Sequence, residues 1–279
     1  MGLQQDRLRD ALEAIRGIKI PEFPQEVIEL DAEIQSKFAN AQNITKIIER
    51  NTTLSGEVVK LANMPVMKAK NPVNTIRDAV TTMGFKNIYN LVVIAAFKRM
   101  FGSRGLHRDI SDNSVDVAFC MAFLTEEVHG IPRDEAYLVG LFHNVGCLML
   151  ASKDEEVYQK IFRSGMSNPI GILQKEQEAF NTNHTLVGLL VAKKWQLPTD
   201  LLNVIMLHHT PDVSKINDDK VRTYVAMLKI ANAIVAEISL GSYIGDEMKA
   251  FLKDGKQELM LDTDFINDLR QQLLTGGTK

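Results

Sequence analysis

The chain has 279 residues, of which 45% are hydrophobic and 24% are charged, proportions typical of a globular protein. Its formal net charge is −3, so no overall basic field would draw it to nucleic acid or to an anionic membrane. The longest purely apolar run, Leu91 to Phe97, is far shorter than the roughly 20 residues of a membrane-spanning helix. We therefore expect a soluble cytoplasmic protein with neither nucleic acid nor membrane as a partner.

The two cysteines, Cys120 and Cys147, each lie within an apolar stretch. No CxxC spacing occurs, and two cysteines could form at most one disulfide. We interpret them as buried, reduced thiols, as expected of a cytoplasmic protein.

Helical periodicity runs through the first hundred residues. An amphipathic helix is expected over 1–17, and further helices over about 53–62 and 85–100. Asn43 is the expected N-cap of a short helix, and Thr75 with Asp78 predicts a capping box for a helix that ends at Met83-Gly84. Steps of three and four residues also place one apolar stripe on a helix, made of Val27, Leu30, Ile34, Phe38 and Ala41.

Residues 101–109 mix glycine, serine and charged side chains. They are the expected boundary between an N-terminal helical lobe, 1–105, and a second helical lobe, 106–279. The C-terminal end predicts one amphipathic helix through Phe265, Ile266, Leu269 and Leu273. Other helices, separated by Gly and Pro, are predicted at about 111–128, 134–150, 154–164, 168–180, 182–195, 198–209 and 221–240. Because no alternating strand pattern of useful length occurs, the predicted fold class is all-α, multi-helical.

Four of the six histidines are candidates for a site: His143, His184, His208 and His209. His143-Asn144 lies in an apolar stretch, where an unpaired buried polar group costs roughly 1–3 kcal/mol, so the pair must find partners or line a cavity. A core histidine with satisfied hydrogen bonds explains His143 equally well. His208 and His209 close a predicted helix, so capping of its last carbonyls is a second simple role. Spacing alone does not show that the four meet.

Several segments, in this order, resemble the HDOD domain, a branch of the HD superfamily of metal-dependent phosphohydrolases. The resemblance covers about residues 18–211 and implies an HD-like helical core with an N-terminal helical lobe. The segments are IKIPEFPQEVIEL, IIERNTTLSGEVVKLANMP with Asn51 where the family has Asp, NTIRDAVTTMGFKNIYNLV, YLVGLFHNVGCLML, EAFNTNHTLVGLLVAKKWQLP and IMLHHTP.

The resemblance also implies positions for a metal site. Active HD hydrolases use an early His, an adjacent His-Asp pair, further histidines and a late Asp. Carried over by position, the pair becomes His143-Asn144, and the further histidines become His184 and His208 or His209. The early His aligns with Asn113 and the late Asp with Asn232. Three ligands are therefore asparagine, which contributes no negative charge to hold a divalent ion.

We therefore expect a vestigial metal site, no catalysis and no cofactor beyond an adventitious transition metal on the remaining histidines. The resemblance implies a non-enzymatic regulatory module of bacterial-type signal transduction that acts through a protein partner. Candidate docking surfaces are the C-terminal helix and the loops at 101–109 and 210–220. A residual metal-dependent phosphohydrolase and a nucleotide-binding pseudo-enzyme sensor stay open as alternatives, as does a homo-oligomer.

Overall fold

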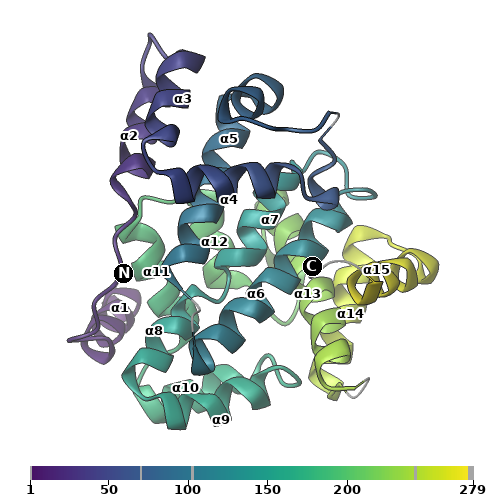
Figure 1. Cartoon of the computed structure of the whole chain (residues 1–279). Helices are drawn as coiled ribbons and strands as arrows, with labels where there is room; N and C mark the ends of the chain where they lie inside the picture. Colours follow the sequence, from purple (N-terminus) through teal and green to yellow (C-terminus); the bar gives the residue numbers. More distant parts are fainter. Residues whose placement is uncertain (1, 70, 102–103, 242–243, 276–279) are drawn as a thin grey trace.

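The computed structural model describes residues 2–69, 71–101, 104–241 and 244–275. Within these ranges the chain forms helices joined by short loops, and they contain no β-strand (Figure 1). The all-α prediction is confirmed. Two residues of the expected lobe boundary, 102 and 103, lie outside the described ranges.

The helices follow one another closely along the chain. The first part contains α1 (Gly2–Ala14), α2 (Gln25–Gln35), α3 (Ala41–Glu49), α4 (Thr52–Ala62), the 3-10 helix η1 (Pro65–Met67), α5 (Ile76–Met100) and α6 (Gly105–Leu124). The second part contains α7 (Arg133–Phe142), α8 (Val145–Lys153), α9 (Glu155–Gly165), α10 (Gly171–Phe180), α11 (His184–Lys194), α12 (Thr199–Leu207), η2 (Val213–Lys215), α13 (Asp219–Ser239), α14 (Asp246–Leu259) and α15 (Thr263–Thr275).

The two predicted lobes share a hydrophobic core. Helices α2, α3 and α4 pack on α5, which in turn packs on α7. Helix α1 contacts α11, so the first helix of the chain lies against the second lobe (Figure 1). One cluster of buried apolar side chains extends from Ala11 to Leu273. The division at residue 105 stays a prediction.

Local capping signals act as the sequence indicates. The Thr75 side chain accepts a hydrogen bond from the Asp78 backbone N–H, and the Asp78 carboxylate accepts one from Thr75, which completes the capping box. Gly84 interrupts α5 with φ 79° and ψ 169°, a backbone conformation that glycine adopts without a Cβ clash. Cys120 and Cys147 are buried free thiols, as predicted.

Some predicted helix bounds are wrong. The N-cap of α3 is Asn40, whose side chain accepts from the Asn43 backbone N–H, so Asn43 lies inside the helix. Helix α2 ends at Gln35, and Phe38 is 86% exposed in the loop, not part of an apolar stripe. Two asparagines three residues apart are equally good local caps, and the tertiary structure selects the first.

Larger differences occur where distant residues end or start a helix. Helix α6 begins at Gly105, six residues before the predicted start at 111, because the Glu155 carboxylate accepts a hydrogen bond from the Leu106 backbone N–H at 2.9 Å. The predicted helix 134–150 is two helices, α7 and α8, which meet at His143-Asn144. Helix α14 is not among the predicted helices.

By length and composition, α5 could cross a membrane. In its most apolar window, however, 56% of the residues are buried inside the protein, and the core helix of a soluble protein passes the same test.

Candidate functional site

One pocket is lined by side chains from several separate elements. Its lining residues come from the break between α7 and α8, the start of α11, the end of α12, and from α6 and α13. Every position predicted for the vestigial metal site lines it: Asn113, His143, Asn144, His184, His208, His209 and Asn232. The structure thus brings together residues that the sequence separates by as many as 119 positions, from Asn113 to Asn232.

Close packing of α8 on α11 shapes this pocket. A Cβ on Gly146 would stand 2.0 Å from the His184 carbonyl oxygen and 2.7 Å from the Gly188 backbone nitrogen. Only glycine at position 146 therefore lets the two helices approach so closely. This contact brings His143, which ends α7, near His184, which begins α11.

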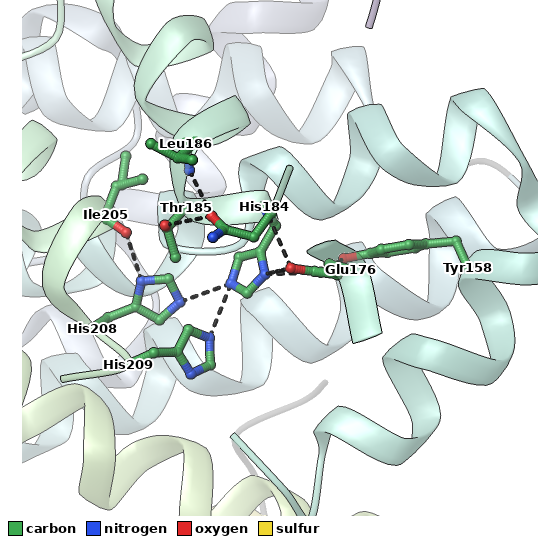
Figure 2. A network of polar contacts seen from close by, with 9 residues as sticks. Tyr158, Glu176, His184, Thr185, Leu186, Ile205, His208 and His209 are labelled. Carbon is green, nitrogen blue, oxygen red and sulfur yellow. Dashed lines mark hydrogen bonds and ion pairs between the residues drawn. The ribbon is translucent and has the colours of Figure 1, made fainter. Parts of the chain in front are cut away.

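A fully buried carboxylate holds His184 in place. Glu176, on α10, lies 2.8 Å from the Nδ1 atom of His184 and accepts a hydrogen bond from the His184 backbone N–H at 2.9 Å. The Tyr158 hydroxyl donates to the same carboxylate at 2.6 Å (Figure 2). Because these oxygens accept, Nδ1 of His184 carries a proton, and in the neutral ring Nε2 then presents a lone pair to the pocket.

Backbone carbonyls orient two more histidines in the same sense. Nδ1 of His208 lies 2.8 Å from the Ile205 carbonyl oxygen, and Nδ1 of His143 lies 2.6 Å from that of Gly140. A carbonyl can only accept, so both Nδ1 atoms carry protons and both Nε2 atoms have free lone pairs. Nε2 of His143 is buried and has no hydrogen-bond partner among the described atoms.

These lone pairs converge. Nε2 of His184 lies 3.1 Å from Nε2 of His208 and 2.9 Å from Nε2 of His209, as Figure 2 shows. His209 can protonate its Nε2 and donate to His184. The His184–His208 contact is different, because two Nε2 lone pairs face each other there. Only a shared proton or a bound cation would remove their mutual repulsion.

Burial favours the neutral form of His143, His208 and His209. Desolvation first, and then the neighbouring His184, lower the pKa of His143 to about 4. The pKa values of His208 and His209 lie well below the ordinary histidine value, first through burial and then through the other imidazoles around them. Neutral imidazole is the form that binds a metal ion.

The cavity between these groups is small. Its volume is about 40 Å³, and Met248 and Phe251 of α14 belong to its wall. Buried Lys229 lies beside them, where its ammonium pairs with Asp254 and sits 4.3 Å from the centre of the Phe251 ring. A volume of this size holds a few waters or one ion.

Sequence reasoning missed three polar residues around the pocket: Tyr158, Glu176 and Lys229. Glu176 follows Ile172 by one helical turn, so it lies on the buried side of α10. Lys229 precedes Asn232 by three residues within the apolar stretch of α13. A charged residue on an apolar helix face is the signal that could have found both.

The fold and the pocket define an all-helical domain with a buried set of histidines. A family model for the HDOD domain matches residues 20–211. The chain therefore belongs to the HDOD domain family.

Solved structures share this fold over nearly the whole chain. An HDOD domain protein of unknown function from Geobacter sulfurreducens is 21% identical, with a TM-score of 0.66, and the match covers 97% of this chain and 98% of that one. A protein from Shewanella amazonensis SB2B, named as a candidate phosphohydrolase, is 21% identical with a TM-score of 0.68, over 96% and 95% of the two chains. A candidate signal transduction protein from Marinobacter aquaeolei VT8 is 19% identical with a TM-score of 0.70, over 99% and 64%.

Two curated relatives have no described function. An uncharacterized protein of Treponema pallidum is 23% identical over 68% of this chain and 37% of its own length. The uncharacterized protein YuxH of Bacillus subtilis is 24% identical over 63% of this chain and 42% of its own length. The matched part of this chain thus spans less than half of either relative.

Proposed function

We propose that this chain is a non-enzymatic regulatory module of the HDOD type that acts through a protein partner. The observation that carries the proposal is the set of amides in the pocket. Asn113, Asn144 and Asn232 line the pocket. The family resemblance implies that Asn144 and Asn232 take two positions at which the HD superfamily uses carboxylates, and that Asn113 replaces a histidine. Neutral amides do not offset the charge of two divalent ions at close range, so the dinuclear chemistry of the superfamily lacks its ligands.

The cavity volume supports the same proposal. Sites for nucleotide-sized ligands measure about 300–1,000 Å³, whereas this pocket measures about 40 Å³ and α14 forms part of its wall. Lone pairs of neutral imidazoles also repel phosphate oxygens. Neither a phosphoester substrate nor a nucleotide ligand fits a site with these properties.

Hydrolysis assays test this proposal. We expect purified protein with Mn²⁺, Mg²⁺ or Fe²⁺ to show no turnover of bis(p-nitrophenyl) phosphate, nucleoside triphosphates or cyclic dinucleotides above the metal-only blank. The variant Asn113→His/Asn144→Asp/Asn232→Asp restores the superfamily ligands and serves as the matched comparison. An enzyme-like rate in the unaltered chain that His143→Ala abolishes would overturn the proposal.

The converging histidines favour a second candidate, a single bound transition metal with a structural role. The HD superfamily implies divalent ions, and here the Nε2 atoms of His184, His208 and His209 fit one ion. Their spacings of 2.9 and 3.1 Å approach the roughly 3.3 Å between two nitrogens on one tetrahedral zinc. Glu176 and the Ile205 carbonyl hold the Nδ1 atoms of His184 and His208, as is usual around metal-bound histidine, whereas Nδ1 of His209 has no partner among the described atoms. A bound ion supplies Lewis acidity.

Metal analysis distinguishes the two candidates. Protein purified without chelators is examined for bound transition metal, before and after His208→Ala, with the exposed His129→Ala as control. One ion per chain that His208→Ala removes and His129→Ala retains would support the structural metal. Added Zn²⁺ at 100 times its Kd should then stabilise the fold by about 2.7 kcal/mol.

A further inference from the structure

Helix α14 separates its charges by side. Most of its acidic residues are bound to neighbouring elements. Glu247 accepts hydrogen bonds from two backbone N–H groups around the start of α10, at 2.9 and 3.1 Å. Asp254 pairs with the buried Lys229, and Glu258 accepts from Arg222 at 2.7 Å. These carboxylates therefore serve the attachment of α14 to the rest of the protein.

The lysines of α14 line the surface of the helix, where Lys249 pairs with Asp246 at 3.3 Å and Lys256 donates to the Thr263 hydroxyl at 3.0 Å. Lys249, Lys253 and Lys256 follow one another at steps of four and three, which places them on one helical face. They line a shallow surface groove of about 570 Å³ together with Leu252, Met260 and Leu261. No acidic side chain is among the described residues that line this groove. A basic, partly apolar strip thus stands on a chain whose net charge is −3.

Met260 is an unusual end for this helix. It is the C-cap, with φ 52° and ψ 32°, and its side chain is 90% exposed. Glycine or asparagine normally occupies this left-handed position, because a Cβ is strained there. Met260 therefore presents a large apolar side chain to solvent at the same groove that the three lysines line.

We propose that this groove, lined by Lys249, Leu252, Lys253, Lys256, Met260 and Leu261, binds an acidic amphipathic helix of a partner protein. Apolar residues of that helix would cover Met260, Leu252 and Leu261, and its carboxylates would meet the three lysines. Charge complementarity selects an acidic occupant, and the apolar strip between the lysines selects a helix with one apolar face. This inference rests on the proposed function, which requires a protein partner, and identifies where that partner binds.

Peptide binding tests the groove. The probe is a fluorescein-labelled 16-residue helical peptide with glutamates on one face and leucines on the other, and its control replaces every Glu by Gln. Fluorescence anisotropy should show the acidic peptide binding at least tenfold tighter than the neutral one, and more weakly as salt rises. Lys253→Glu/Lys256→Glu should weaken binding at least tenfold. The control Lys153→Glu/Lys160→Glu changes exposed lysines by the same net charge and should leave binding unchanged.

Met260→Gly separates docking from stability. Glycine relieves the strain of the left-handed cap, so the melting temperature should rise, while loss of the apolar side chain should weaken peptide binding at least threefold. A purely structural role for Met260 would not give these opposite signs.

Three results would overturn the groove proposal. The first is that the Lys253→Glu/Lys256→Glu variant binds the acidic peptide as tightly as the unaltered chain does. The second is that the neutral peptide binds as tightly as the acidic one. The third is a dimer in analytical ultracentrifugation that Met260→Gly dissociates, which would mean that a second copy covers the groove. The hydrolysis assay is independent of all three, so failure of the groove proposal leaves the non-enzymatic role standing.

Discussion

The two sides of α14 present different kinds of polar group. Its inner side helps to enclose the histidine pocket, where Met248 and Phe251 form part of the wall and hydrogen bonds to Nδ1 orient His143, His184 and His208. Its outer side carries lysines in a shallow groove. A buried polar group without a partner costs free energy, so the pairing of these Nδ1 atoms reports the demands of the fold. Exposed charges cost the fold little free energy, so their arrangement can be complementary to a binding partner.

The contacts of the pocket histidines with Glu176 and with backbone carbonyls are those that burial requires of any polar group. The groove on α14 lies beyond residue 211, where the family match ends. Four changes test whether the pocket is rigid and structural while the outer face of α14 is tolerant.

The largest effect is expected at Glu176. Glu176→Ala removes the acceptor for the His184 ring, the His184 backbone N–H and the Tyr158 hydroxyl, and leaves three buried donors without partners. We expect a loss of about 3–5 kcal/mol in the free energy of unfolding, measured in urea. The control Glu178→Ala, exposed on the same helix, should change it by less than about 0.5 kcal/mol. A small loss at Glu176 would mean that the pocket is not rigid.

Gly146→Ala should cost nearly as much. The new Cβ would stand 2.0 Å from the His184 carbonyl oxygen, and a backbone atom cannot move aside as a flexible side chain can. We expect a loss of about 3 kcal/mol in unfolding free energy by calorimetry. Gly56→Ala is the matched control, because nothing lies within 4 Å of its added Cβ inside α4, and it should stabilise the chain by about 0.5–1 kcal/mol. Equal effects of the two changes would contradict close packing of α8 on α11.

The metal-free protein should lose stability as the pH falls from 7 towards 4. His143 titrates near 6.5 when unfolded, whereas burial lowers its pKa to about 4 in the folded chain, where His184 and His208 face it. Between these values the unfolded state binds more protons than the folded state, so the free energy of unfolding decreases as the pH decreases. The loss for His143 alone is about 2 kcal/mol at pH 5.

Urea midpoints at pH 7.5 and 5.0, with EDTA present, measure this dependence. His143→Asn keeps a donor for the Gly140 carbonyl but removes the titrating ring, so it should flatten the pH dependence. The exposed His129→Asn should retain the full dependence. A steep dependence that survives in His143→Asn would assign it to other groups.

The smallest effect is expected on the outer face. Met260→Gly relieves left-handed strain of about 1–2 kcal/mol and adds unfolded-chain entropy worth about 0.4–1 kcal/mol. The net gain in the free energy of unfolding, measured by urea denaturation, should be about 0.5 kcal/mol. A loss of stability would mean that Met260 supports the fold, and the contrast between the two sides of α14 would fail.

Much of this protein follows from signals that span a few residues. Apolar spacing predicts most helices, and Thr75 with Asp78 predicts a capping box that the structure confirms, because these interactions lie within one helical turn. The order of the HDOD segments likewise gave the family, which the match over 20–211 confirms. The sequence alone also names Asn113, Asn144 and Asn232 as site residues, and the structure places all three at the pocket.

Only the tertiary structure decided what depends on distant contacts. The start of α6 needs Glu155, which lies 49 residues after Leu106. The direction of each histidine lone pair depends on which acceptor meets Nδ1, and for His184 that acceptor is Glu176 on another helix. Three of the four carboxylates of α14, those of Glu247, Asp254 and Glu258, bind partners on other elements, whereas its lysines line the groove on α14. Local patterns encode helices, but hydrogen bonds between helices determine which polar groups meet and which remain free.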